Sequence, residues 1–129
     1  MCGCATTKAT TCPTGKSGGC GCEAIPEGSD TFNYEARYEI GRTRYVCPAE
    51  LTAEVAASVT TAALETWSVL GCAGFARVDV MLDDSGPQVL EVNSIPGLTD
   101  TSLLPIAAEA GGVSFERFVE RALALATTR

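Results

Sequence analysis

Two stretches of alternating apolar and polar residues flank the turn signal Asp84-Ser85-Gly86. The first runs from Phe75 to Leu82, and the second runs from Gln88 to Asn93. This alternation is typical of strands with one buried face, and the three residues between them suit a hairpin loop with Gly86 in the left-handed conformation. The sequence therefore predicts an antiparallel hairpin, which requires further strands or a helix to cover it.

The loop length decides which residues of the hairpin oppose each other. A three-residue loop pairs Asp83 with Pro87, and counting back sets Met81 opposite Val89, Asp79 opposite Glu91 and Arg77 opposite Asn93. Directly opposed residues share a sheet face. One face is thus predicted to carry Arg77, Asp79, Glu91 and Asn93, and the other to carry Val78, Val80, Leu82, Leu90 and Val92. A two- or four-residue loop would put Asp79 and Glu91 on opposite faces.

The polar face has the composition of a site for a hard metal ion. Two directly opposed carboxylates repel each other, and a divalent cation removes that repulsion. Asp79, Glu91 and Asn93 offer only oxygen ligands, which suit Mg²⁺. The chain has no histidine, which excludes histidine metal sites and Ser-His or Cys-His catalysis. The alternative is a plain amphipathic hairpin whose polar face meets water.

Helical patterns surround the hairpin, so an α+β fold is expected. Apolar residues from Leu51 to Leu70 step by three or four, with Pro48 before them and Gly71 as a stop. A turn at residues 95–99 leads to an apolar helical run that begins at Ser102, and Gly97 in that turn can offer backbone N–H groups to an anion. A capped helix after a plain turn is the alternative. The remaining elements are an extended stretch at residues 32–38 and a last helix capped by Ser114 that buries Phe115, Phe118, Val119, Ala122 and Leu125.

The length and the charge of the chain limit the functions that it can have. A chain of 129 residues forms one domain, and a net charge of −7 with nine scattered basic residues argues against nucleic acid as a partner. No apolar run approaches the roughly 20 residues that span a bilayer, so no membrane association is expected. The N-terminus does not resemble a secretory signal, which makes the cytoplasm the expected location.

Residues 1–22 differ from the rest. They hold five of the seven cysteines together with Gly and Thr and almost no large apolar residue. We expect an irregular, unstructured tail, with the folded domain covering residues 23–129; a small thiolate metal site is the alternative. Disulfides are not expected in a cytosolic chain.

Several motifs resemble D-alanine–D-alanine ligases of the ATP-grasp group. They are YEARY, CPAEL, GCAGFARVDVML and VLEVNSIPGLTDTSLLP, in this order. R-x-D followed by E-x-N-x-x-P-G is shared by much of the ATP-grasp group, whereas T-x-x-S-L-x-P is more specific to dipeptide ligases. The resemblance covers essentially everything after Cys22. It implies the C-terminal half of an ATP-grasp domain, with an antiparallel sheet packed against helices.

The resemblance also implies roles for single residues. Asp79, Glu91 and Asn93 would hold two Mg²⁺ (or Mn²⁺) ions that bridge the phosphates of ATP. Arg37 stands where the family usually has a phosphate-binding lysine.

For the acyl transfer itself, Arg77 and the N–H of Gly97 would stabilise the oxyanion, which is the usual electrostatic device in such reactions. Tyr38 would lie in the loop that covers the site. Ser102 and Leu103 would hold the second D-alanine. The histidine of the D-alanine–D-lactate relatives is absent, which favours D-alanine as the second substrate.

The implied activity is ATP- and magnesium-dependent ligation of two D-alanines for peptidoglycan synthesis. The resemblance covers about the last third of a typical member, so the chain is expected to be inactive alone and to need the missing N-terminal part, or a homodimer. Another ATP-grasp carboxylate–amine ligase, a non-catalytic magnesium- or nucleotide-binding module and a cysteine-rich metal-binding protein remain alternatives.

Overall fold

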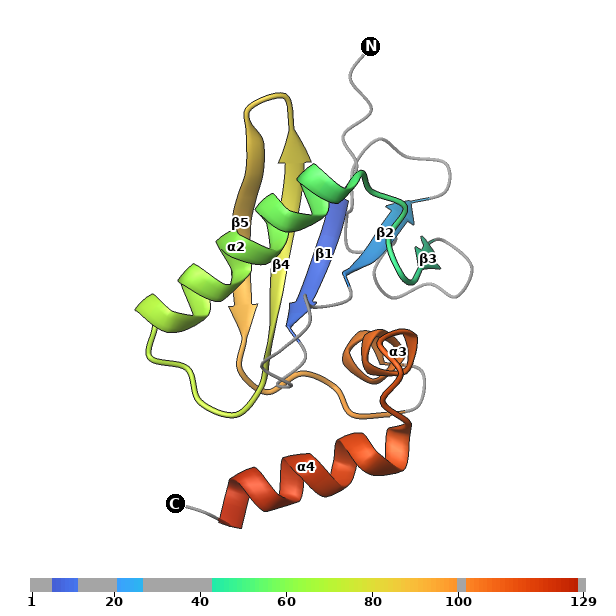
Figure 1. Cartoon of the computed structure of the whole chain (residues 1–129), viewed down its shortest axis with the longest axis vertical. Helices are drawn as coiled ribbons and strands as arrows, with labels where there is room; N and C mark the ends of the chain where they lie inside the picture. The colour runs from blue at the N-terminus through green and yellow to red at the C-terminus, as the bar shows by residue number, and fades with distance from the viewer. Residues whose placement is uncertain (1–5, 12–20, 27–42, 100–101, 128–129) are drawn as a thin grey trace.

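A computed structural model describes residues 6–11, 21–26, 43–99 and 102–127. Within these ranges the chain forms an antiparallel sheet of five strands with three helices around it, as the α+β expectation requires (Figure 1). No helix among the described residues is both long and apolar enough to cross a bilayer. In chain order the elements are β1 (Thr6–Thr11), β2 (Cys22–Pro26), β3 (Thr43–Val46), α2 (Ala53–Val69), β4 (Ala76–Asp83), β5 (Gly86–Asn93), α3 (Leu103–Ala110) and α4 (Phe115–Thr127).

The strands lie in the order β3-β2-β1-β4-β5, and every neighbouring pair is antiparallel. Strand β1 therefore lies inside the sheet, with Lys8 opposite Cys22 of β2 on one side and opposite Asp79 of β4 on the other. The expectation of an unstructured tail is wrong for residues 6–11. Four of these six residues are threonine, a β-branched residue that favours strands, and pairing on both edges supplies the remaining stabilisation.

The expected boundary at Glu23 falls inside a strand. Strand β2 runs through it from Cys22 and pairs with both β1 and β3. Glu23 lies opposite Val46, and the next residues along, Cys22 and Cys47, form a disulfide with their Cα atoms 4.5 Å apart. The expectation that the cysteines stay unpaired is therefore wrong for this pair.

Helix α2 covers one face of the sheet (Figure 1). It begins at Ala53, two residues after the first apolar residue of the predicted stripe, because the Thr52 hydroxyl accepts a hydrogen bond from the Val55 N–H at 3.4 Å. It ends before Gly71, the predicted stop, whose φ is +63°. Its buried residues pack on the apolar side of β4. The resulting core consists of Val59, Ala63, Val78 and Val80, with Val55, Leu82 and Val92 packed against it.

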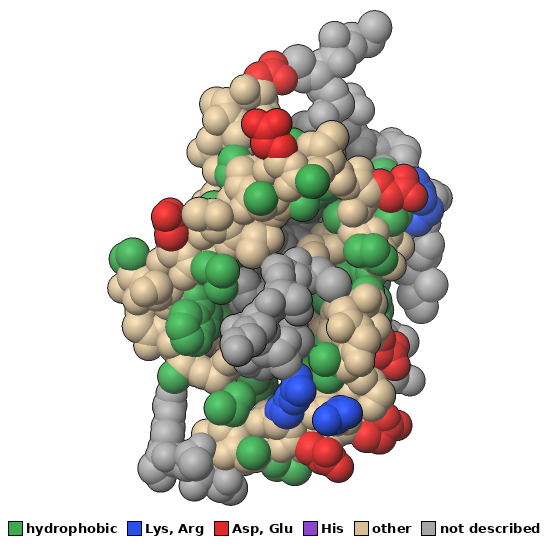
Figure 2. All heavy atoms as spheres, in the orientation of Figure 1, with side chains coloured by type: hydrophobic (Ala, Val, Ile, Leu, Met, Phe, Trp, Pro, Cys, Tyr) green, Lys and Arg blue, Asp and Glu red, His purple; other side chains and the backbone are tan. Residues whose placement is uncertain are grey.

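Only a narrow stripe of α2 is buried. Figure 2 shows apolar side chains between acidic ones on the visible face of the molecule. Three exposed apolar residues belong to the second half of α2 or follow it directly, and these are Leu64, Val69 and Leu70. The predicted stripe is thus confirmed in its centre at Val59, but it does not extend to Leu70.

A second core joins α3 and α4. It contains Leu104, Ala108 and Phe118, and the ring of Phe118 meets that of Phe75 edge to face, with 5.5 Å between the ring centroids. Ser114 caps α4 through a hydrogen bond from the Arg117 N–H at 3.4 Å, as the sequence predicts. The predicted burial of Leu125 is wrong, because this residue is exposed. Phe75 precedes β4, so this core fixes one end of the strand that carries the polar residues.

Replacing Cys47 with Ser tests the disulfide. The bond closes a loop of 25 residues, and closing a loop of that size in the unfolded chain contributes about 3 kcal/mol. We expect Cys47→Ser to lower the free energy of unfolding by about that amount without a reducing agent, measured by urea denaturation. With a reducing agent the wild-type chain should approach the variant. Cys72→Ser, at a free cysteine, is the control; equal stability of Cys47→Ser and wild type without a reducing agent would contradict the bond.

Candidate active site

The hairpin loop is shorter than the sequence predicts. Asp83 pairs with Gly86, so only Asp84 and Ser85 lie between the paired residues, and Pro87 pairs with Leu82. Gly86 does have the positive φ expected of it, at +112°. The predicted three-residue loop and its pairing of Asp83 with Pro87 are therefore wrong.

Hydrogen bonds from Ser85 explain the tight loop. The Asp83 carboxylate accepts from the Ser85 N–H at 2.8 Å and from the Ser85 hydroxyl at 2.5 Å. The Gln88 amide then donates to the same hydroxyl at 3.1 Å. The bonds from the Ser85 hydroxyl, followed by that from its N–H, hold the pKa of Asp83 below its usual value. An aspartate that bonds the backbone two residues ahead favours a turn at that point.

A β-bulge restores the pairing that the short loop would have destroyed. Val80 pairs with Val89, yet the next residue of β4, Asp79, pairs with Glu91, so Leu90 is an extra residue in β5. The register shift lies between Asp79 and Val80. Because one inserted residue reverses the side of every residue beyond it, Asp79 and Glu91 again share a face.

The opposition of Asp79 to Glu91 and of Arg77 to Asn93 is thus confirmed, although the loop length used to predict it is wrong. Two details of the predicted faces change with the bulge. Met81 pairs with Gln88 instead of Val89, and Leu90 is exposed instead of belonging to the apolar face.

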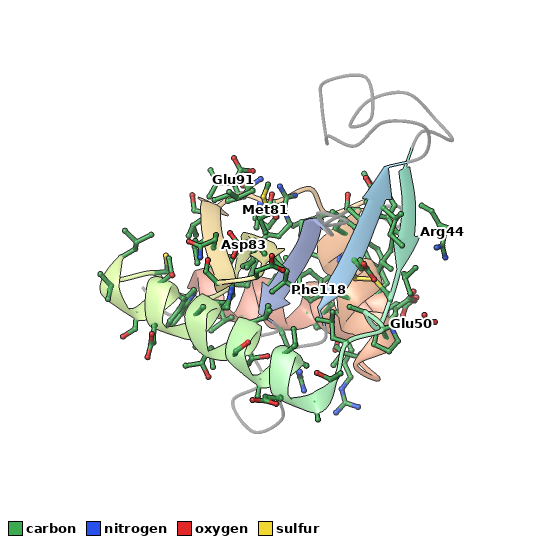
Figure 3. The ribbon with its side chains drawn as sticks, turned by 90° about the horizontal axis from the view of Figure 1, so that it is seen from above. Arg44, Glu50, Met81, Asp83, Glu91 and Phe118 are labelled. Carbon is green, nitrogen blue, oxygen red and sulfur yellow. A yellow bond between two sulfur atoms is a disulfide. The ribbon has the colours of Figure 1, made fainter. Side chains whose placement is uncertain are left out.

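Arg77 joins the two carboxylates. Its Nε lies 2.8 Å from Oδ1 of Asp79 and its Nη2 lies 3.2 Å from Oδ2 of the same residue. The same Nη2 lies 3.5 Å from Oε1 of Glu91. Figure 3 shows Glu91 and Met81 on the side of the hairpin that faces away from α2. The guanidinium therefore supplies positive charge to two opposed carboxylates.

Burial differs sharply across this group. The side chains of Arg77 and Asp79 are 11% and 5% exposed, whereas that of Glu91 is 49% exposed. A buried carboxylate is stable only with a partner, which Arg77 provides to Asp79 through two hydrogen bonds. An exposed ion pair such as Arg77–Glu91 contributes only about 0–1 kcal/mol. Glu91 is consequently the member of the group that changes partner most easily.

The turn after β5 connects the polar face to α3. Oδ1 of Asn93 accepts a hydrogen bond from the Ile95 N–H at 3.1 Å, which begins the turn. Ser102 is the N-cap of α3, but its hydroxyl does not cap the helix. It lies 2.7 Å from Oγ1 of Thr99 and accepts from the Thr99 N–H at 3.2 Å. The sequence did not predict that Thr99 would bind Ser102. The T-x-x-S spacing of these two residues was the only sign of it.

Gly97 is required by the close approach of Ser102. A Cβ atom built on Gly97 would lie 2.8 Å from Oγ of Ser102, which is closer than real Cβ contacts allow. Leu103, the first residue of α3, is half-buried beside this turn. Two segments that the sequence analysis singled out, around Gly97 and Ser102, are therefore in contact. Arg37 and Tyr38 lie outside the described residues.

The donor set fits a hard divalent cation. Asp79, Glu91 and Asn93 offer carboxylate and amide oxygens from two adjacent strands, on one face. Among the described residues no group of three His, Cys, Asp or Glu gathers, and the oxygen of Asn93 is the further ligand that these two strands offer beside Asp79 and Glu91. Mg²⁺ typically binds one or two carboxylates and completes its shell with water and phosphate.

Solved structures with this fold are ATP-grasp ligases. The D-alanine–D-alanine ligase from Bacillus anthracis, crystallised as a complex with ATP, superposes with a TM-score of 0.75 over 98% of this chain, at 31% sequence identity. The VanG D-Ala:D-Ser ligase from Enterococcus faecalis superposes with a TM-score of 0.70 at 28% identity. The fold and the oxygen-rich face thus define part of an ATP-grasp ligase.

The chain belongs to the D-Ala-D-Ala ligase C-terminal family, whose model matches residues 15–124. Among curated relatives, the D-alanine–D-alanine ligase of Syntrophotalea carbinolica is 44% identical over 107 residues, or 83% of this chain and 35% of the relative. That of Synechococcus sp. is 48% identical over 102 residues, or 78% of this chain and 32% of the relative. The chain therefore spans about a third of the length of these relatives. The match begins before Glu23, so it includes part of the segment expected to be an unstructured tail.

Adding a methyl group at position 97 tests the contact with Ser102. We expect Gly97→Ala to lower the free energy of unfolding by about 1–3 kcal/mol, because the new Cβ overpacks against Oγ of Ser102. The double variant Gly97→Ala/Ser102→Ala should recover part of the loss, since the nearest remaining atom, Cβ of Ser102, is at an ordinary 3.6 Å. Thermal denaturation of both variants and of Ser102→Ala measures the coupling. Additive losses would mean that the two residues do not touch.

Proposed function

We propose that this chain is the C-terminal part of a cytoplasmic ligase that uses ATP and Mg²⁺ to join two D-alanines into D-alanyl-D-alanine for peptidoglycan synthesis. The observation that carries the proposal is the sheet face shared by Arg77, Asp79, Glu91 and Asn93. The turn that follows this face in the chain holds Gly97 close to Ser102. In a reducing cytoplasm Cys22 and Cys47 would be two neighbouring thiols.

Asp79, Glu91 and Asn93 would hold the metal, as two Mg²⁺ or Mn²⁺ ions. When bound, such ions neutralise phosphate charge and orient the phosphates of ATP for transfer. Carboxylates from adjacent strands of one sheet suit this purpose, because the sheet fixes their geometry better than a flexible loop would. Arg37, in the segment before β3, would contact a phosphate of ATP.

Arg77 and the N–H of Gly97 would stabilise the oxyanion that forms when the second amine attacks the acyl phosphate. Among the described residues, the Gly97 N–H donates no hydrogen bond, which leaves it available as a donor. Ser102, held by Thr99, and Leu103 would bind the second D-alanine at the start of α3. Tyr38 would cover the site.

The identity of the second amino acid separates two candidate functions. The fold matches a D-Ala:D-Ser ligase nearly as well as it matches a D-alanine–D-alanine ligase. Another ATP-grasp carboxylate–amine ligase is therefore the second candidate function. In either case the catalytic unit would include the other two thirds of a full-length ligase, or a second copy of the chain, as its partner.

Thermal unfolding with Mg²⁺ tests the proposed metal site. A ligand that binds only the native state stabilises it, by about 2.7 kcal/mol at one hundred times its dissociation constant. We expect Mg²⁺ to raise the melting temperature of the wild-type chain, and ATP added with Mg²⁺ to raise it further. Glu91→Gln should lose most of the Mg²⁺ effect.

Glu109→Gln, which removes the same charge from an exposed position on α3, is the matched control and should keep the effect. Melting temperatures of the wild type and of Glu109→Gln that do not change with Mg²⁺ would contradict the site. An equal response in all three chains would show that Mg²⁺ binds elsewhere.

A further inference from the structure

One nitrogen of Arg77 lies between the two carboxylates of the site. Nη2 is 3.2 Å from Oδ2 of Asp79 and 3.5 Å from Oε1 of Glu91. It is through Nη2 that Arg77 contacts Glu91. A cation that bridges Asp79 and Glu91 needs the same place. Arg77 and a divalent ion therefore compete for one position.

The hairpin register makes this arrangement possible. Arg77 and Asp79 are two residues apart in β4, so they share a face, and Glu91 lies diagonally across from Arg77. The long arginine side chain spans that diagonal. Nε separately contacts Oδ1 of Asp79 at 2.8 Å, so Arg77 has one firm attachment that does not involve Nη2.

We propose that Arg77 is the internal counter-ion of the metal-free site, and that a divalent cation displaces its Nη2 from between Asp79 and Glu91. This inference rests on the proposed function, because it assumes that the two carboxylates bind a metal. The exposed Glu91 gives up its long contact with Nη2 first, while the buried Asp79 keeps its bond to Nε. Loading the metal thus frees Nη2 for the substrate oxyanion, so that Arg77 couples metal binding to oxyanion stabilisation.

Two opposite effects of one substitution follow. Arg77→Met keeps an unbranched apolar side chain that reaches about as far as Nε, and it removes the charge. The metal-free variant should unfold at a lower temperature, because the buried Asp79 loses the two hydrogen bonds that Arg77 donates. The same variant should bind a divalent cation more tightly, by about tenfold or more, because a competing positive charge has gone. If Arg77 only stabilised the fold, Arg77→Met would weaken metal binding and the fold together.

Binding of Mn²⁺, followed by the electron paramagnetic resonance signal of the free ion, measures this affinity in the full chain. Wild type, Arg77→Met and the control Arg44→Met, which removes an exposed arginine of β3, are compared. Arg44→Met should bind Mn²⁺ as the wild type does. Equal or weaker binding by Arg77→Met, while the wild type binds, would overturn this inference and leave the proposed metal site intact. No binding to the wild type would overturn the proposed function and this inference together.

A measurement on the wild type covers the case in which Arg77→Met does not fold. The Nε–Hε resonance of Arg77 should shift when diamagnetic Mg²⁺ saturates the chain, and that of Arg44 should not. The Arg77 signal is assigned from its absence in Arg77→Lys. A chain that binds Mg²⁺ with an unchanged Arg77 resonance would overturn the displacement of Nη2.

Discussion

The register between β4 and β5 is the constraint on which the polar face and the core both depend. Side chains alternate along a strand, so a shift of one residue moves each side chain to the opposite face. Continued without interruption, the pairing of Asp83 with Gly86 would place Glu91 on the side of α2. The extra residue Leu90 reverses the alternation once, which returns Glu91 to the side of Asp79 and leaves Val92 against the core beneath α2.

The two faces of the hairpin are stabilised in different ways. On one side Val78 and Val80 are fully buried against α2. On the other, Asp79 is buried as well and is stable because Arg77 bonds both of its oxygens. The site therefore already places a guanidinium beside its two carboxylates, and the proposed metal would exchange with this cation instead of filling a purely negative site.

Local patterns predicted the elements well, whereas pairings between distant segments escaped prediction. The period of α2 and its stop at Gly71 are both properties of neighbouring residues. The bulge at Leu90 contains no glycine, and its one local trace is that Val89 and Leu90 are both apolar, which interrupts the alternation of β5. Strand β1 depends on partners in β2 and β4, which composition alone could not reveal, and the cysteine pair Cys22–Cys47 becomes visible only when β2 and β3 are aligned.

Cross-strand nuclear Overhauser contacts along β4 and β5 test the register most directly. The structure predicts that backbone protons of Val80 contact those of Val89, that those of Asp79 contact those of Glu91, and that Leu90 is the unpaired residue between them. A regular ladder would instead pair Asp79 with Leu90 and Val78 with Glu91. That result would put the two carboxylates on opposite faces of the sheet and contradict a shared metal site.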